Sequence, residues 1–438
     1  MAARIVRPLT RRQLMGVLSA SLASTAWAPR LVATTRTMTT QSDDLDPLAA
    51  DVLPLGVRAR FVNNVNGLRM HVLEAGFGTT GRPGVLLVHG FPELAYSWRK
   101  VMPRLAAAGY HVIAPDLRGY GRTDGTSVTY DDDLGPFRML NEIRDMLALV
   151  SAFGYRHIHL VGHDFGSLVA SWCAVARPDV FRSVVLMSAP FGGTATLPFN
   201  TADGPPDSFD RDSRSDIYEE LAQLTPPRKH YRSFYSTREA NNNMWQAAQG
   251  VHAFLRAYYH MKSGDWNENQ PHPLREWSAT ELAQLPRYYV MDLDKGMAET
   301  VAAHMPSAAE IAACEWLPDT ELRIYSSEYE RTGFQGGLQW YRSNTSVSSL
   351  FGGAGINADL QVFAGRTIDQ PSLFVAGKSD WGVYQRPGAV EQMQTSACTD
   401  MRGVHLLDGA GHWVQQEQPA AASQLILQFL QQLPDGNQ

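Results

Sequence analysis

Three residues whose types suit nucleophilic, acid and base chemistry each follow a short apolar run. Asp164 follows "HIHLV", Asp380 follows "SLFVAGKS", and His412 follows "VHLLDGAG". Taken singly, they also have plain structural explanations as a helix cap, a turn aspartate and an exposed loop histidine. Their order along the chain, a nucleophile, then an acid, then a histidine, favours a catalytic triad in which the acid orients the histidine.

The sequence around Asp164 has the outline of a sharp turn between a strand and a helix. Gly162 and Gly166 flank it in "GHDFG", and such a turn needs a small residue on each side of the nucleophile. Serine is the usual nucleophile there, and a histidine must deprotonate it before it attacks a carbonyl carbon. An ionised aspartate needs no such activation, so Asp164 indicates direct displacement at a saturated carbon.

A second turn, "VHGFPE", follows the strand expected to lie beside Asp164. Gly90 lets the backbone turn back toward the nucleophile, and Phe91–Pro92 is a candidate cis bond because cis peptides are almost confined to proline. We expect the backbone N–H groups of Phe91 and Phe165 to point at one oxygen and form an oxyanion hole. The alternative is that the glycine and the proline only shape a turn.

The elements that must position these residues repeat as strand, turn and helix. Short runs rich in valine, isoleucine and leucine occur at residues 84–90, 111–116, 157–162, 183–189, 371–377 and 403–409. Helix-length segments such as 139–153 separate such runs, as in sheets of buried parallel strands. The predicted fold class is therefore α/β, a mostly parallel sheet covered by helices. Active sites in such sheets usually lie just outside the carboxyl ends of the strands, where the candidate triad would lie.

The strand repeat is interrupted in the middle of the chain. We expect a leader at residues 1–42, a first part of the core at 43–194 and a second part at 366–438. Residues 195–365 carry helical stretches rich in aromatic residues, so we predict an inserted, mostly helical cap domain there.

Composition argues against several other classes of protein. The chain has 438 residues, 44% of them hydrophobic, and a net charge of -6, and no block of Lys or Arg lies outside the N-terminal segment. Nucleic acid is therefore not expected as a partner, and no segment is long and apolar enough to span a membrane. The three cysteines are widely spaced and outside any CxxC pattern, so neither a disulfide framework nor a metal site is predicted.

The first 42 residues differ in composition from the rest, with six arginines and no acidic residue before Asp43. "TRRQLMG" resembles a twin-arginine export signal, whereas arginines that continue past the apolar run are typical of a mitochondrial transit peptide. A disordered tail is the third interpretation, with Met38 as the start of a cytoplasmic protein. We favour the mitochondrial interpretation.

Four motifs, "HGFPE", "GHDFG", "AGKSDWGVYQ" and "GAGHWVQQEQP", together resemble the epoxide hydrolases of the α/β-hydrolase fold. The resemblance implies two cap tyrosines that donate hydrogen bonds to the epoxide oxygen. "RTGFQGGLQWYR" matches the second tyrosine motif of that family and places the residue at Tyr341. "KHYRSFYS" resembles the first and puts Tyr231 in register, with Tyr235, Tyr258 and Tyr259 as competitors.

The resemblance also implies a reaction. Asp164 would open an apolar epoxide to a covalent alkyl ester, and His412 with Asp380 would direct water to release a vicinal diol, a detoxification chemistry without cofactor or metal. Epoxide and water would be the partners, and a homodimer is left open. One alternative is a haloalkane or haloacid dehalogenase with the same aspartate nucleophile, although the Phe165 side chain cannot donate a hydrogen bond to a halide. The other is a non-catalytic binding protein on this fold.

Overall fold

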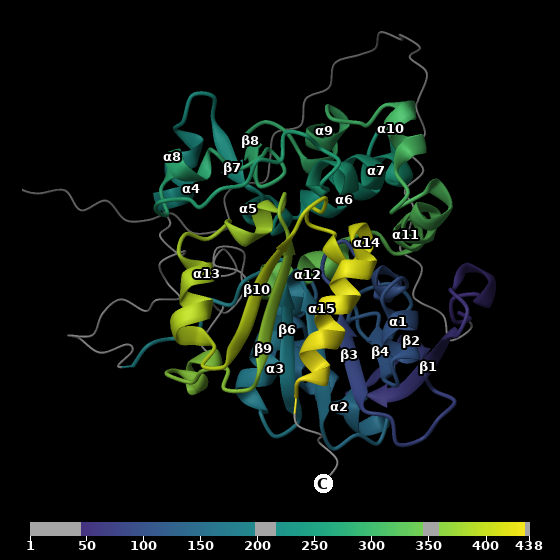
Figure 1. Ribbon diagram of the computed structural model, residues 1–438. Coiled ribbons are helices and arrows are strands. Elements are labelled where there is room, and N and C mark those ends of the chain that lie inside the picture. The colour runs from purple at the N-terminus through teal and green to yellow at the C-terminus, as the bar shows by residue number, and fades with distance from the viewer. Residues whose placement is uncertain (1–44, 198–215, 345–358, 434–438) are drawn as a thin grey trace, which may run out of the picture. The chain divides into compact units, whose positions relative to one another are not determined.

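The computed structural model describes residues 45–197, 216–344 and 359–433, and a twisted sheet forms the centre of this part of the chain (Figure 1). Its strand order is β1-β2-β4-β3-β5-β6-β9-β10. The strands are β1 (Val57–Val65), β2 (Leu68–Ala75), β3 (Gly84–Val88), β4 (His111–Pro115), β5 (Ile158–His163), β6 (Phe181–Met187), β9 (Ser372–Gly377) and β10 (Met401–Leu407). Every neighbouring pair from β4 to β10 is parallel, whereas β2 pairs antiparallel with both β1 and β4.

The central strands are apolar along their whole length because both faces of the sheet are covered. Every residue of β3 and of β9 is buried, and so is all of β6 except Arg182. The six apolar runs of the sequence are β3, β4, β5, β6, β9 and β10. The predicted α/β class, with its mostly parallel sheet, is confirmed.

Two pairs of strands had not been predicted. β1 and β2 form a hairpin whose turn contains Asn66 and Gly67, with φ of 50° and 85°. Asn-Gly is the residue pair that such a turn favours, so the signal was present in the sequence and was overlooked. The second pair is a short ribbon of β7 (Arg228–His230) and β8 (Val290–Asp292) inside the region expected to be mostly helical.

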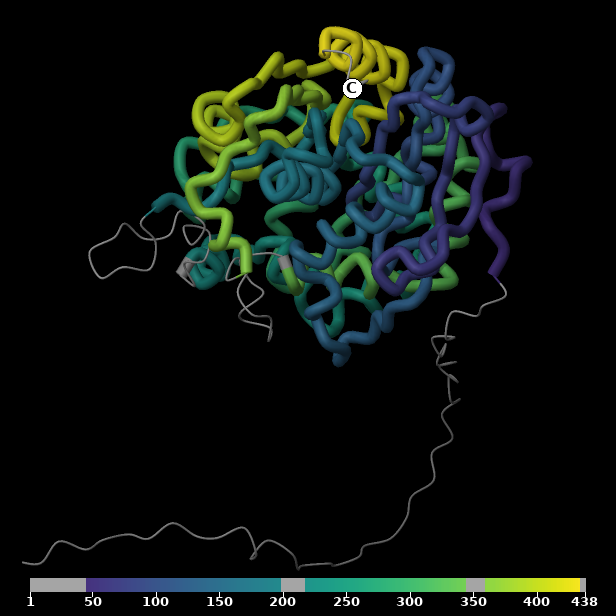
Figure 2. Tube along the Cα trace, turned by 90° about the horizontal axis from the view of Figure 1, so that it is seen from below, coloured from purple at the N-terminus to yellow at the C-terminus, as the bar shows by residue number. Residues whose placement is uncertain are grey.

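Helices cover both faces of the sheet (Figures 1 and 2). α1 (Met102–Ala107) and α15 (Pro419–Gln431) contact each other on one face, and α2 (Met139–Ala152) packs with α3 (Phe165–Ala176) on the other. The amphipathic pattern of α2 explains its position. Its buried residues include Met139, Ile143, Met146 and Val150, which recur at helical spacing on one side.

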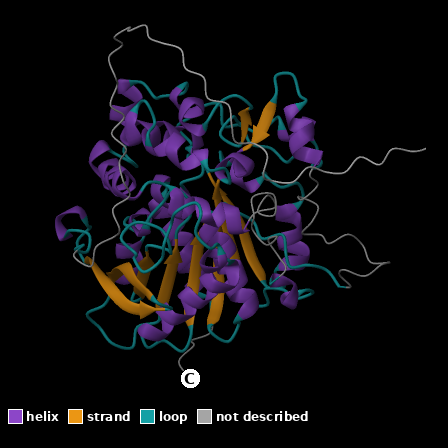
Figure 3. Cartoon of the chain, turned by 180° about the vertical axis from the view of Figure 1, so that it is seen from behind, coloured by secondary structure: helices purple, strands orange, loops and turns teal. Residues whose placement is uncertain are grey.

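A group of helices lies over the carboxyl ends of the sheet strands (Figures 1 and 3). They are α4 (Asp216–Ala222), α5 (Tyr231–Tyr235), α6 (Glu239–Trp245), α7 (Gly250–Lys262), α8 (Ala279–Leu282), α9 (Met297–Ala302), α10 (Ala308–Ala313), α11 (Asp319–Thr332) and α12 (Gln335–Asn344). We call this group the cap. The chain leaves the sheet after β6 to form the cap and returns to it at β9.

The leader expected at residues 1–42 lies outside the described residues, so its targeting role stays a prediction. Among the residues that the structure describes, no helix is both long and apolar enough to cross a membrane. The same residues contain no cluster of three or more His, Cys, Asp or Glu side chains that could hold a metal ion.

Candidate active site

Asp164 sits at a strained turn between β5 and α3. Its φ is 55°, a left-handed conformation that residues other than glycine rarely adopt. A Cβ on Gly162 would lie 2.1 Å from the carbonyl oxygen of Gly166, and a Cβ on Gly166 would lie 2.2 Å from that of Val88. Both glycines of the predicted motif are therefore required by close backbone approaches.

The two carboxylate oxygens of Asp164 have different partners. Oδ1 accepts the backbone N–H of Phe91 at 3.0 Å, whereas Oδ2 lies 3.3 Å from Nε2 of His412. Gly90 makes the first contact feasible, because a Cβ there would lie 2.4 Å from the Cβ of Asp164. The "HGFPE" turn thus reaches one oxygen of the carboxylate and leaves the other to the histidine.

The structure brings the three residues of the candidate triad together. His412 Nδ1 lies 3.0 Å from Asp380 Oδ1, and both side chains are buried. Asp380 caps the short helix at Trp381–Val383, where it accepts the Gly382 N–H at 2.7 Å. Because an ionised carboxylate only accepts hydrogen bonds, Nδ1 carries the proton and Nε2 faces Asp164.

The charges around the triad favour an ionised nucleophile. Burial opposes the charge of Asp164, but the hydrogen bond and charge of His412 and the charges of Lys262 and His163 outweigh it and lower the pKa of Asp164. The pKa of Asp380 is also lowered, because the contact with His412 outweighs burial. Asp164 is therefore available as a carboxylate at neutral pH.

A buried ion pair lies beneath the turn that carries Asp164. Glu93 Oε2 lies 2.5 Å from His163 Nδ1, and His163 Nε2 donates to the backbone oxygen of His412 at 2.7 Å. Although burial opposes both charges, their mutual attraction lowers the pKa of Glu93 and raises that of His163. The pair links three loops of the site. Glu93 lies in "HGFPE" and His163 lies in "GHDFG", but neither residue was predicted to have a role.

Glu417 in α14 (Val414–Glu417) holds the loop of His412 from both sides. Its carboxylate accepts the N–H groups of Gly411 and Trp413 at 2.9 Å each, and that of Gly264 in the cap at 2.6 Å. Burial raises the pKa of Glu417 to about 8, and the three N–H groups act against this rise because they favour the carboxylate. Glu417 was not singled out from the sequence.

The oxyanion hole stays a prediction, and two observations bear on it. The Phe91 N–H contacts Asp164, and the Phe91–Pro92 bond is cis, as expected. Phe165 is the first residue of α3, where a backbone N–H has no acceptor within the helix. That its N–H points at the same oxygen stays a prediction.

Both predicted cap tyrosines lie near the nucleophile. The ring of Tyr341 lies edge-on to Phe165 and Phe91, with centroids 4.8 Å and 5.4 Å away. The ring of Tyr231 lies 5.8 Å from that of Tyr341. The Tyr231 hydroxyl donates to Gln385 Oε1 at 3.1 Å, a contact that the sequence analysis did not foresee.

Two glycines explain how α12 brings Tyr341 so close to the core. A Cβ on Gly336 would lie 1.8 Å from the carbonyl oxygen of Gly119, and a Cβ on Gly337 would lie 2.5 Å from the ring of Phe91. Any side chain at these positions would push α12 away from the core. The "GG" of the tyrosine motif therefore positions the tyrosine that follows it.

The hydroxyls of the competing tyrosines already have partners. The Tyr235 hydroxyl contacts that of Tyr258 at 3.3 Å, and Tyr259 donates to the backbone oxygen of Pro92 at 3.0 Å. The ring of Tyr235 nevertheless lies 4.9 Å from that of Tyr341. The choice of Tyr231 over Tyr235 thus stays a prediction.

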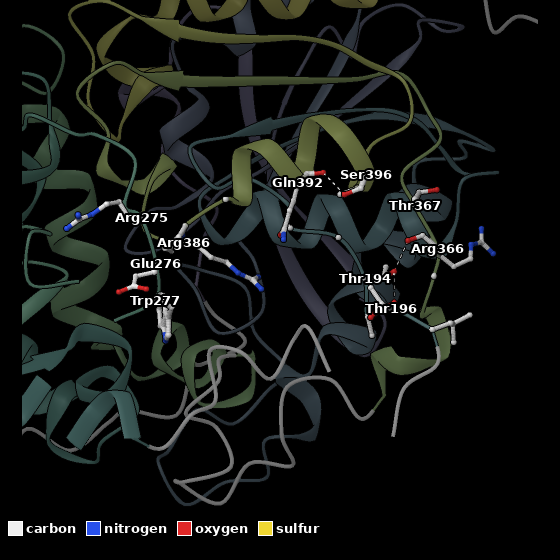
Figure 4. A pocket seen from close by; sticks show the side chains of 18 residues that line it. Thr194, Thr196, Arg275, Glu276, Trp277, Arg366, Thr367, Arg386, Gln392 and Ser396 are labelled. Atoms are coloured by element: carbon white, nitrogen blue, oxygen red, sulfur yellow. Dashed lines mark hydrogen bonds between the residues drawn. The ribbon is translucent and has the colours of Figure 1, made fainter. Parts of the chain in front are cut away.

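Figure 4 shows an open pocket of about 790 Å³, and none of the three triad residues lines it. Arg275 and Trp277 of the cap and Arg386 of the core line it. Gln385, the partner of Tyr231, is adjacent to Arg386 in the chain. The geometry of the triad, not the size of this pocket, locates the chemistry.

Comparisons with known proteins agree with this architecture. The family described as alpha/beta hydrolase fold matches residues 83–419. The epoxide hydrolase of Caballeronia sordidicola is 30% identical over 368 residues, which cover 83% of this chain and 91% of that protein. Epoxide hydrolase A of Mycobacterium tuberculosis is 30% identical over 380 residues, which cover 86% of this chain and 98% of that protein.

Solved structures give the same result. An epoxide hydrolase from an endophytic Streptomyces superposes with a TM-score of 0.63 at 30% identity, covering 86% of this chain and 96% of that one. Epoxide hydrolase A from Mycobacterium thermoresistibile superposes with a TM-score of 0.64 at 28% identity. The chain therefore belongs to the α/β-hydrolase fold family, and within that family to the epoxide hydrolases. The resemblance drawn from the four motifs is confirmed.

Proposed function

We propose that this protein hydrolyses an epoxide to a vicinal diol through a covalent alkyl ester on Asp164. The unequal environment of the two carboxylate oxygens is the observation that carries the proposal. Oδ1 is held by the Phe91 N–H, whereas Oδ2 faces His412 and accepts no backbone N–H from the residues that the structure describes. Oδ2 is accordingly the oxygen that attacks, and Oδ1 becomes the carbonyl oxygen of the ester.

In the first half-reaction, Oδ2 attacks an epoxide carbon and the carbon–oxygen bond of the strained ring breaks. The bonding electron pair goes to the epoxide oxygen, and Tyr231 and Tyr341 donate hydrogen bonds to that oxygen, one of them supplying its proton. The packing of the Tyr341 ring against Phe91 and Phe165, the residues of the proposed oxyanion hole, supports this placement.

In the second half-reaction, Nε2 of His412 takes a proton from water, and the resulting hydroxide attacks Cγ of Asp164. The Phe91 and Phe165 N–H groups stabilise the negative charge that forms on Oδ1. The bond between Cγ and Oδ2 then breaks, so Oδ2 leaves with the diol and receives the proton from His412. The second proton of the water, left on the new carboxyl oxygen of Asp164, passes to the tyrosine that gave its proton in the first half-reaction, which restores both groups. Asp380 accepts the Nδ1–H and stabilises the charged imidazole.

The surroundings of the site favour an epoxide with an apolar body over a halide substrate. Aromatic rings gather around the nucleophile, including those of Phe91, Phe165, Tyr235 and Tyr341. A dehalogenase needs a donor for the departing halide, and the side chain of Phe165, directly after Asp164, has none.

A single-turnover experiment in heavy-oxygen water tests the proposal. Enzyme in excess is mixed with styrene-type, aliphatic and terpene epoxides, and the diol and the peptide containing Asp164 are weighed by mass spectrometry. We expect an unlabelled diol and a heavier Asp164 peptide, because the diol takes Oδ2 and water replaces it. A labelled diol with an unchanged peptide would contradict attack by Asp164, and binding without turnover would favour a non-catalytic protein.

A further inference from the structure

Each of the two cap tyrosines is followed in the chain by an arginine, and the two arginines are placed differently. Arg232, next to Tyr231 in α5, directs its Nε–H at the Tyr231 hydroxyl, whose oxygen lies 3.5 Å from Nε. Arg342, next to Tyr341 in α12, instead donates to the backbone oxygen of Tyr130 at 2.6 Å and lies over the Tyr130 ring. The same pair of residue types therefore brings a guanidinium to the Tyr231 hydroxyl and directs the other guanidinium at Tyr130.

Backbone contacts fix Tyr231 and Arg232 at the start of α5. The Tyr231 N–H donates to the backbone oxygen of Tyr289 at 2.8 Å, and the Arg232 N–H donates to Nδ1 of His230, the residue that caps this helix, at 3.3 Å. Tyr231 is buried and Arg232 is half-buried. Salt and water screen such a charge less than a charge on the surface, so Arg232 acts strongly on the hydroxyl beside it.

The Tyr231 hydroxyl has an acceptor as well as this donor. It donates to Gln385 Oε1 at 3.1 Å, while the Nε–H of Arg232 is directed at its oxygen. An amide carries an acceptor oxygen and a donor NH₂ group, so Gln385 can accept from the phenol and, turned over, donate to the phenolate. The surroundings of this hydroxyl therefore suit both of its protonation states.

The charges near the two cap hydroxyls differ in the same sense. Burial and the charge of Asp164 raise the pKa of Tyr231, but the charge and hydrogen bond of Arg232 act against this rise. Burial raises the pKa of Tyr341 well above its usual value, and Asp164 adds to the rise. The ring of His230 lies 5.0 Å from that of Tyr231 and is neutral, because burial lowers its pKa well below the usual value. Tyr231 therefore loses its proton more readily than Tyr341.

We propose that Arg232 is a positioning residue that makes Tyr231 the proton donor of the first half-reaction, while Tyr341 only donates a hydrogen bond. As the carbon–oxygen bond of the epoxide breaks, its electron pair and the Tyr231 proton both go to the epoxide oxygen. Arg232 then stabilises the phenolate until the proton returns in the second half-reaction. The inference rests on the proposed function and assigns to one tyrosine the proton that this reaction requires.

Two substitutions separate the charge of Arg232 from its bulk. Arg232→Met removes the charge, and Arg232→Lys keeps it. With the fastest of the styrene-type, aliphatic and terpene epoxides, we expect ester formation near neutral pH to slow about tenfold in Arg232→Met and to stay within about threefold of wild type in Arg232→Lys. The fall of the rate at alkaline pH should move to higher pH in Arg232→Met, because loss of the cation raises the pKa of Tyr231 and keeps its hydroxyl protonated. Structural damage alone would lower the rate without this move.

A fluorinated tyrosine tests the assignment without a change of Arg232. Fluorine makes the phenol more acidic and changes its size little, and general acid catalysis becomes faster with a stronger acid. Fluorotyrosine at position 231 should therefore speed ester formation about fivefold near neutral pH, whereas at position 341 the change should stay below about twofold. Combined with Arg232→Met, fluorotyrosine at position 231 should restore most of the lost rate.

Arg238→Met is the matched control, because Arg238 is an exposed cap arginine whose guanidinium lies 4.3 Å from the centroid of the Tyr130 ring. It should keep the wild-type rate and the wild-type profile at alkaline pH. A wild-type rate in Arg232→Met, an alkaline fall that stays in place, or a larger effect of fluorotyrosine at position 341 than at 231 would each overturn the inference. In those outcomes the epoxide is still opened, so the proposed function stands. Failure to hydrolyse any epoxide would overturn both.

Discussion

The core side and the cap side of the active site are built in opposite ways. On the core side, Asp380 and His412 are buried and Asp164 is partly buried, and each is held by directional contacts to backbone or side-chain partners. On the cap side, Tyr231 and Tyr341 stand in a wall of rings that meet mostly edge-on, with few hydrogen bonds.

The two sides should therefore differ in which substitutions they tolerate. Hydrogen bonds need narrow ranges of length and angle, so removing one hydrogen-bond partner on the core side should displace the side chains that it holds. Ring pairs accept a wider range of arrangements, so an aromatic side can lose a hydroxyl and keep its shape. Removing a side chain of the candidate triad should therefore cost more than removing a cap hydroxyl, and the two changes should act on different half-reactions.

The largest effect is expected for His412→Gln. Because the proposal gives His412 a role only in the hydrolysis of the ester, this variant should still open the epoxide, while turnover falls by about a thousandfold. Intact-mass spectrometry should then detect an adduct of one substrate on Asp164. His405→Gln, a change of the same type on β10, is the control and should form no lasting adduct. Rapid diol release by His412→Gln without an adduct would refute the division of roles.

On the cap side, Tyr341→Phe should slow formation of the ester about a hundredfold, since it removes one donor to the developing charge on the epoxide oxygen. Stopped-flow measurement of the first half-reaction checks this, and the double change with Tyr231→Phe should nearly abolish the step. If Tyr235→Phe is impaired and Tyr231→Phe is not, Tyr235 is the second donor and the register chosen for α5 is wrong.

A smaller effect on the core side is expected for Glu417→Gln. Both side-chain oxygens of Glu417 accept backbone N–H groups, and the glutamine amide would turn its NH2 group toward one of these donors, so the loop of His412 loses part of its support. We expect hydrolysis of the ester to slow about tenfold while formation of the ester is unchanged. Single-turnover kinetics of both steps give the answer, with the exposed Glu391→Gln as control. Equal slowing of both steps would mean that Glu417 supports the whole fold instead.

The smallest effect concerns stability in acid, where the core side should weaken first. Asp116 is buried, and its contact with His71 outweighs burial and lowers the pKa of Asp116 to about 2. A depressed pKa gives stability that is present above the unfolded value of about 3.8 and is lost as the pH falls toward 2, about 2 kcal/mol in all.

Asp116→Asn tests this expectation, because it lacks the titrating group and should show a flatter decline of the unfolding midpoint between about pH 4 and 2. Asp51→Asn, which removes an exposed carboxylate, is the control and should leave the profile unchanged. A wild-type profile for Asp116→Asn would show that the acid weakness lies elsewhere.

The same contrast explains how far the sequence could predict the site. The triad could be located because each residue follows an apolar run at the carboxyl edge of a parallel sheet. The pair of Glu93 and His163 could not, because their contact depends on how the side chains of two separate turns pack against each other. Spacing along the chain does not show that.

The cap side was harder to predict for a physical reason. Tyr231 and Tyr235 lie four residues apart in α5, so both face one side of the helix and only packing tells them apart. Lys262, whose charge helps to lower the pKa of Asp164, was not predicted to lie near it, because a basic residue at the end of a helix is ordinarily a surface residue near the helix dipole. Its burial follows from rings contributed by separate segments of the chain, which no local pattern reveals.

In the proposed reaction the two oxygens of the Asp164 carboxylate have different fates, because only one of them is held by a backbone N–H group. Oδ1 stays under the Phe91 N–H, while the oxygen facing His412 leaves with each diol and is replaced from water. Each product molecule then carries the oxygen atom that entered the enzyme during the previous turnover. In the proposed reaction, a change of oxygen isotope in the water therefore reaches the diol one turnover later.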